Sequence, residues 1–251
     1  MTGQQPRWSH ARFDSGRGYE ARKPSHARGG FTHARKAHPM PRTILQLCAD
    51  TGSDTWPYRN DPDYEVITVG QDIGVENYHP DRPIHGIIAN PVCTEFSPVR
   101  RGKPGENYPH VSDPEKGMFL VRECQRIIAE AQPQWWAIEN PAMGTLRNYL
   151  GKPDFTYQPW WYGSPWTKST GLWGNFTIPP RKYTAWDDVP GKLDLWTRPG
   201  RTKPSIVYLH KSAFQRIPEF RDSGMPAPES DAELRSLCSQ KFAAAFKLAN
   251  P

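Results

Sequence analysis

Four short, mostly apolar runs dominate the sequence after residue 42, and each ends in polar, glycine or proline residues. The runs are "TILQLCAD" (43–50), "YEVITVG" (64–70), "HGIIANP" (85–91) and "WWAIEN" (135–140). Short, continuously apolar runs are typical of strands that are buried on both faces, as in a parallel sheet. They limit the possible folds strongly, because a parallel sheet needs helices to cover its two faces.

Two longer segments place apolar residues at helical spacing. The segment 112–131 has Pro114 suited to the first turn of a helix and Cys124 in its apolar stripe. The segment 230–250 begins with Ser230 and Glu233 at the spacing of a capping box and has Cys238 in its stripe. We therefore expect an α/β fold with a mostly parallel sheet, helices on both faces, and both cysteines in the core. The Pro- and Trp-rich stretch from 152 to 228 has no regular pattern.

The positive charge of the chain lies at its amino terminus. Residues 1–42 hold nine Lys/Arg against Asp14 and Glu20, whereas the whole chain has a net charge of +6. This basic segment has almost no aliphatic residues, so burial cannot offset the entropy of ordering it. We interpret 1–42 as a disordered basic arm that either attracts nucleic-acid phosphates or only adds solubility. The catalytic domain is then expected over 43–251.

The remaining composition excludes several classes of protein. The four cysteines have neither the spacing of a zinc site nor that of a disulfide framework, so no metal is predicted. No run approaches the ~18 apolar residues of a membrane span, and no secretory signal is recognised at the amino terminus. We expect a soluble, intracellular protein.

Chemically useful side chains follow three of the predicted strands. Asp50 follows the first, Cys93 the third and Glu139 ends the fourth. Ligands of α/β sheets bind beyond the carboxyl ends of the strands, where a thiol is accessible and turn amides favour its thiolate. Taken singly, Cys93 could be a small buried residue and Glu139 a loop cap. Their joint placement favours a nucleophilic cysteine facing an acid/base carboxylate.

The segments "LQLCADTGS", "ANPVCTEFS", "IENPAMG", "YGSPWTKSTGLWGNF" and "SQKFAAAFKLANP", in this order, resemble the cytosine-C5 DNA methyltransferase family, particularly its short phage and prophage members. The resemblance covers roughly residues 43–251. It implies a Rossmann-like, S-adenosylmethionine-dependent methyltransferase fold, DNA as the partner with RNA left open, a monomer, and the cytoplasm of a bacterium or of a phage-infected host.

The resemblance also implies roles for individual residues. Cys93 would add to C6 of the cytosine, Glu139 would hold the proton on the N3 side of the base, and Asn140 would hold the loop. Lys168 stands where the family often has arginines that contact the base. The residues implied for binding S-adenosylmethionine are Asp50, Thr51, Gly52, Ser53, Asp72, Asn90 and Pro91.

The sequence departs from the family pattern in the first turn, where Asp50 stands in a usual glycine position, and at Val92, which replaces a proline. Only about fifty residues, 177–229, could form an insertion that recognises the target sequence, so a specificity partner is possible. A cluster of aromatic residues precedes this insertion and would either pack against the sheet or meet nucleic acid: Trp160, Trp161, Tyr162, Trp166 and Trp173.

Three other functions stay open at this point. "ANPVCTEF" partly matches the motif of amino-group methyltransferases that act on adenine or cytosine, although Cys93 fills the position where those enzymes need an aromatic ring. A transferase could instead make another modification at C5. A protein of the same fold could also bind nucleic acid without catalysis and keep Cys93 only as part of the scaffold.

Overall fold

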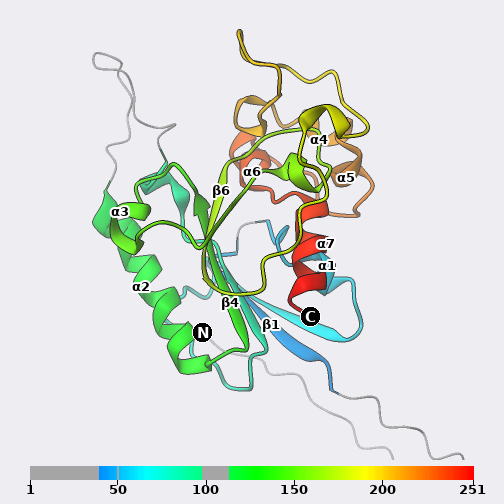
Figure 1. Cartoon of the computed structure of the whole chain (residues 1–251). Helices are drawn as coiled ribbons and strands as arrows, with labels where there is room; N and C mark the ends of the chain where they lie inside the picture. The colour runs from blue at the N-terminus through cyan, green and yellow to red at the C-terminus, as the bar shows by residue number, and fades with distance from the viewer. Residues whose placement is uncertain (1–39, 50, 98–112) are drawn as a thin grey trace, which may run out of the picture. The chain divides into compact units, whose positions relative to one another are not determined.

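The computed structural model describes residues 40–49, 51–97 and 113–251, and these contain a six-stranded sheet (Figure 1). The strand order is β2-β1-β3-β4-β6-β5. The bounds are β1 Arg42–Leu47, β2 Tyr64–Val69, β3 Gly86–Ala89, β4 Trp135–Pro141, β5 Phe155–Tyr157 and β6 Thr170–Asn175. The four predicted strands are confirmed, and they form the parallel part of the sheet.

The sequence did not predict β5 and β6. β6 pairs antiparallel to β4, with Glu139 opposite Leu172, and β5 pairs antiparallel to β6. β6 reads "TGLWGN", and its two glycines interrupt the apolar run that would have marked a strand. This strand matters for the site, because it begins two residues after Lys168.

Helices cover both faces of the sheet, as predicted. On one face lies α2 (Pro114–Ala131), whose N-cap Asp113 accepts a hydrogen bond from the backbone N–H of Lys116 at 3.2 Å. Cys124 of this helix is fully buried in the core between α2 and the sheet, so its assignment to the core is confirmed. The other face is covered by α1 (Trp56–Arg59) and α7 (Gln240–Ala249), which pack around Ile44, Ile88 and Ala137 of the sheet.

The segment 230–250 is not one helix, as its apolar stripe suggested, but two. Ser230 caps α6 (Asp231–Ser236) by accepting from the N–H of Glu233, and Ser239 caps α7 by accepting from the N–H of Phe242. The second cap breaks the helix because an N-cap residue has an extended backbone. Cys238 lies between the two helices; it is 3% exposed, so the prediction that it is buried is confirmed.

The insertion after β6 has a small apolar core of its own. It contains α4 (Ala213–Arg216), α5 (Pro218–Arg221) and two short 3-10 helices, η4 (Trp186–Asp188) and η5 (Ile206–Tyr208). Trp166 joins this core and donates its indole N–H to Glu219 Oε1 at 2.7 Å. In Figure 1 this part of the chain, yellow to orange, lies beyond the end of the sheet at which β4 ends and β6 begins.

The aromatic cluster mostly packs inside the protein. Tyr162, Trp166 and Trp173 are buried, whereas Trp160 and Trp161 in η3 (Pro159–Tyr162) are half-buried. Packing is therefore the correct interpretation for the first three. In the described part of the chain, no helix is long and apolar enough to cross a membrane.

Candidate active site at the carboxyl ends of the strands

The turn after β3 presents Cys93 to solvent. Cys93 opens the 3-10 helix η1 (Cys93–Glu95), and its side chain is exposed. Gly117 of α2 lets this turn pack closely, because a Cβ at Gly117 would stand 2.6 Å from the ring of Phe96 and 2.9 Å from Cβ of Glu95. The thiol is thus presented by a turn that is braced by α2.

Two hydrogen bonds join the Cys93 turn to the end of β4. Asn90 donates from Nδ2 to Glu139 Oε2 at 3.3 Å. Asn140, which is fully buried, donates from Nδ2 to the carbonyl oxygen of Pro91 at 2.9 Å. Four residues predicted for the site, Asn90, Pro91, Glu139 and Asn140, are therefore brought together. Because Cys93 follows Pro91 by two residues, the turn that carries its thiol lies beside the end of β4 that carries Glu139.

Lys168 lies close enough to these residues to feel their charges. Its Nζ donates to the carbonyl oxygens of Ser236 at 2.9 Å and Leu237 at 3.2 Å. Burial by itself would lower the pKa of the ammonium, but the nearby charges of Glu139 and Asp54, and more weakly the thiols, outweigh it and raise the pKa above its usual value. Cys93 is one of those thiols. Lys168 therefore stays protonated and places a positive charge near both Glu139 and Cys93.

Asp54 is a site residue that the sequence reasoning missed. Burial, together with the charge of Glu139, raises the pKa of its carboxyl to about 6, although Lys168 and a hydrogen bond with Cys238 act in the opposite direction. Asp54 also lines a small cavity with Cys238 and the sheet residues Ile88 and Ala137. The signal in the sequence was its place directly after the first-strand turn "TGS". Nothing in the family resemblance pointed to a carboxyl there.

The turn after β1 has the features of a ligand-binding loop. Gly52 has φ +70°, a conformation that favours glycine, and a Cβ there would meet nothing closer than 3.8 Å. Thr51 and Gly52 are half-buried. Ser53, in contrast, is completely buried: its hydroxyl accepts from the N–H of Cys238 at 2.9 Å and its carbonyl oxygen accepts from Gln240 Nε2 at 2.9 Å. Ser53 therefore supports the turn from behind. Asp50 lies outside the described residues, as do residues 1–39.

Asp72 is exposed and reaches back toward the β1 turn. A Cβ on Gly70 would stand 3.1 Å from Asp72 Oδ1 and 3.4 Å from the carbonyl oxygen of Ala49, so the carboxylate lies beside the end of β1. The Asp72 carboxylate thus lies on the same side of the sheet edge as the chain that leaves β1.

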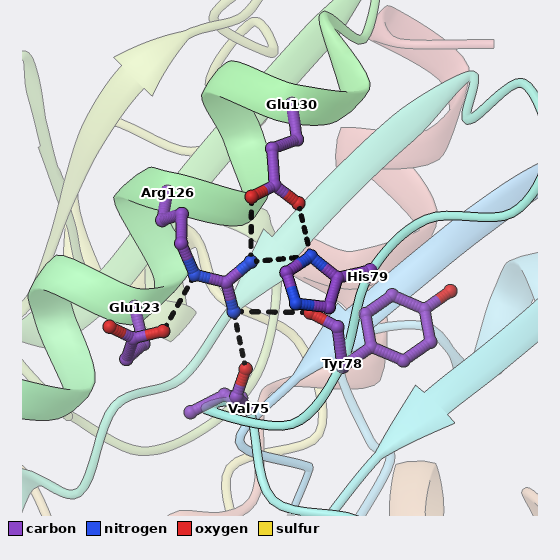
Figure 2. Close-up of polar contacts among 6 residues, drawn as sticks. All are labelled: Val75, Tyr78, His79, Glu123, Arg126 and Glu130. Atoms are coloured by element: carbon purple, nitrogen blue, oxygen red, sulfur yellow. Dashed lines mark hydrogen bonds and ion pairs between the residues drawn. The ribbon is translucent and has the colours of Figure 1, made fainter.

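The loop that carries Asp72 is fastened to α2 by one arginine (Figure 2). Arg126 donates from Nη2 to the carbonyl oxygens of Val75 at 2.9 Å and Tyr78 at 3.1 Å. Glu123 at 2.7 Å and Glu130 at 2.9 Å hold its guanidinium in place. The helix that braces the Cys93 turn thus also fixes the loop after β2.

Two thiols, one half-buried and one buried, lie close together at the end of β1. Cys48 directly follows β1 in the left-handed region, with φ 51°, and its Sγ lies 3.7 Å from Sγ of the buried Cys124. Contact with Cys48 and burial raise the pKa of the Cys124 thiol well above its usual value, so Cys124 stays protonated. Of the cysteines, only Cys93 is exposed.

Comparison with known proteins supports the resemblance seen in the motifs. No protein-family model matches the chain. The chain is 31% identical over 124 residues to a protein of Frog virus 3 (isolate Goorha) described as a "Probable DNA (cytosine-5)-methyltransferase". This match covers 45% of the chain and 55% of the viral protein, so the chain spans little more than half the length of that relative. The resemblance to cytosine-C5 methyltransferases is thereby confirmed.

A solved structure also resembles the chain. It is described as a "putative DNA modification methyltransferase" encoded within a prophage of E. coli, with 17% identity and a TM-score of 0.36, over 53% of this chain and 46% of that one. A likeness at this TM-score is too weak to carry an argument.

Proposed function

We propose that the chain is a DNA methyltransferase, and specifically one that transfers a methyl group from S-adenosylmethionine to C5 of a cytosine taken out of the base stack. The observation that carries the proposal is the pair of hydrogen bonds that ties the Cys93 turn to Glu139 and Asn140. They join the turn of an exposed thiol to the strand end of a carboxyl, and the charges of both act on the Lys168 ammonium, which supports the proposal. The viral relative supports the same activity.

The three side chains match what the reaction needs. C5 of cytosine is a poor nucleophile, and addition of the Cys93 thiolate to C6 moves electron density to C5. The protonated Lys168 favours that thiolate, and Glu139 holds a proton on the N3 side of the ring. Methyl transfer to C5 releases the donor as its neutral thioether, S-adenosylhomocysteine. A water molecule then takes the proton from C5, the C5–C6 double bond re-forms as the bond between Sγ and C6 breaks, and the thiolate is returned while the N3 proton goes back to Glu139. The base must first leave the duplex stack, at a cost of a few kcal/mol.

The turns after β1 and β2 would hold S-adenosylmethionine. This donor supplies an electrophilic methyl group bonded to a sulfonium sulfur. Gly52 permits close approach of the backbone, Thr51 offers a hydroxyl beside it, and Asp72 would accept hydrogen bonds from ribose hydroxyls. Asn90 and Pro91 join the end of β3 to β4, Asn90 through Glu139 and Pro91 through Asn140. We assign Ser53 to support of the turn and not to contact with the donor, since it is fully buried.

Nucleoside mass analysis of DNA tests the proposal. Purified full-length protein is incubated with S-adenosylmethionine and unmodified DNA, and the digest is examined for 5-methylcytosine, N4-methylcytosine and N6-methyladenine. We expect 5-methylcytosine with the native protein and none with Cys93→Ser. Met143→Ala serves as the matched control, because Met143 is exposed just past β4 and does not take part in the proposed chemistry. A product on an exocyclic nitrogen, or equal product from Cys93→Ser, would contradict the proposal.

A further inference from the structure

A partly exposed surface of aromatic rings and cations lies on the insertion and on η3, which contributes Trp160. We call it the aromatic–cation surface and define it as Trp160, Trp186, Trp196, Arg198, Lys203 and Tyr208. Trp196 is 54% and Tyr208 46% exposed, and their ring centroids are 6.1 Å apart at an interplanar angle of 66°. The insertion has its own apolar core, and these two large rings lie outside it in solvent. Packing therefore does not explain their exposure.

The rings of this surface carry positive charges. Lys203 Nζ lies 4.6 Å from the ring centroid of Trp160 and 5.6 Å from that of Trp186. The guanidinium of Arg198 lies 6.0 Å from the ring of Tyr208. Residues 177–211 contain seven Lys/Arg against three Asp. Within the described part of the chain, Arg198 and Lys203 form no ion pair with a carboxylate, so their charges are available to a ligand.

The backbone connects this surface to the proposed active site. The N–H of Thr167 donates to the carbonyl oxygen of Pro204 at 2.9 Å, and the N–H of Ile206 donates to the carbonyl oxygen of Thr167 at 3.2 Å. The segment that carries Lys203 and Tyr208 is therefore paired with the residue directly before Lys168. A strand whose base entered the cleft beside Lys168 would have neighbouring nucleotides within reach of this segment.

We infer that the aromatic–cation surface binds an unpaired nucleic-acid strand next to the target base, with a base stacked on Trp196 or Tyr208 and phosphates near Arg198 and Lys203. Stacking on rings beside a cationic groove is how proteins bind single strands, since every base has a face that can stack. The inference rests on the proposed function and specifies its substrate: the preferred DNA has single-stranded or opened character beside the cytosine. Recognition of a duplex through its grooves would not use the exposed rings of Trp196 and Tyr208.

Fluorescence anisotropy with labelled oligonucleotides of one sequence, single-stranded and as a duplex, tests this inference without any donor or turnover. We expect the double variant Trp196→Ala, Tyr208→Ala to bind the single strand about tenfold or more weakly, with a much smaller change for the duplex. Trp196→Phe, which keeps a ring, should retain most of the affinity. Phe119→Ala is the control, because Phe119 is 46% exposed on α2, and it should bind as the native protein does.

Salt dependence tests the cationic part of the inference. Arg198→Gln with Lys203→Gln should make the plot of log affinity against log salt less steep by about 0.7 for each phosphate of a single strand that the variant no longer neutralises. Unchanged single-strand binding in the ring variants, or an equal weakening for single strand and duplex, would overturn the inference. Circular dichroism of each variant establishes that it is folded.

The two proposals can fail separately. If the ring variants bind normally while 5-methylcytosine still forms, the surface inference is wrong and the proposed function stands. If the ring variants lose single-strand binding while no 5-methylcytosine forms with the native protein, the surface inference stands and the proposed function is wrong.

Discussion

Asp54 should reduce the stability of the folded protein at neutral pH. Its carboxyl has a pKa of about 6 in the fold against an ordinary 3.8, chiefly because of burial and the charge of Glu139. The folded state thus binds this proton more tightly than the unfolded state does. The stabilising effect of the proton is complete below pH 3.8 and is lost as the pH rises through about 6.

The size of the effect follows from the two pKa values. One pKa unit is worth about 1.4 kcal/mol, so ionisation of Asp54 costs the folded state about 3 kcal/mol at pH 8 and about half as much at pH 5. Asp54→Asn removes the ionisable group and keeps the shape of the side chain. The variant should therefore unfold with a free energy about 3 kcal/mol larger than the native protein at pH 8, and the gain should fall toward pH 5.

Urea denaturation at pH 5 and pH 8 measures this difference, provided that both variants show the same slope with urea. Asp61→Asn is the matched control with the opposite sign. Lys247 donates a hydrogen bond to Asp61 and lowers the pKa of that carboxyl, so its replacement should destabilise the protein at pH 8. An Asp54→Asn variant that is less stable than the native protein at pH 8, or whose gain does not change with pH, would refute the reasoning. We interpret a carboxylate kept at such a cost as a group that helps to hold Lys168 protonated.

The remaining predictions concern Lys168, Arg126 and the basic arm. Lys168→Met should lower kcat by about tenfold or more, since it removes the positive charge that acts on Cys93 and Glu139, and a loss of about 1.4 kcal/mol in transition-state stabilisation is tenfold in rate. The KM for the donor should change little, and a normal kcat would remove Lys168 from the mechanism. Arg126→Ala should raise the Kd of S-adenosylmethionine several-fold, because it removes two hydrogen bonds to the Asp72 loop at about 1 kcal/mol each. Arg122→Ala, which replaces an exposed arginine of the same helix, should leave this Kd unchanged. Titration calorimetry with S-adenosylmethionine measures both values. Deletion of residues 1–39, which leaves Arg42 in β1, should flatten the salt dependence of DNA binding by about 0.9 for each phosphate that the arm neutralises, and an unchanged slope would show that the arm takes no part in binding.

The parallel strands and α2 could be predicted from the sequence because they are short-range patterns. Continuous apolar runs identify β1 to β4, and a proline with a helical stripe identifies α2. β6 could not be predicted in this way, because its glycines hide the pattern and its stability comes from pairing with β4, far away in the sequence. The break between α6 and α7 depends on the second cap at Ser239, which the apolar stripe conceals.

The candidate site likewise contains residues whose positions could be predicted from the sequence and residues whose positions could not. The positions of Cys93 and Glu139 could be predicted because Cys93 follows β3 and Glu139 lies near the end of β4, and the carboxyl ends of parallel strands meet at one edge of a sheet. Asp54 could not, because what makes it unusual is its proximity to Glu139, Lys168 and Cys238, which come from three distant parts of the chain. The burial of Ser53 was likewise invisible, since its partners Cys238 and Gln240 lie nearly two hundred residues away.

Covalent trapping tests the central claim most directly. A DNA oligonucleotide with 5-fluorocytosine blocks the loss of the C5 substituent, so a thiolate that has added to C6 stays attached after methyl transfer. Intact mass measurement and peptide mapping should show one oligonucleotide per protein chain, bonded at Cys93, in the presence of S-adenosylmethionine, and no adduct with Cys93→Ser. An adduct on another residue, or none with a native protein that methylates DNA, would contradict the account.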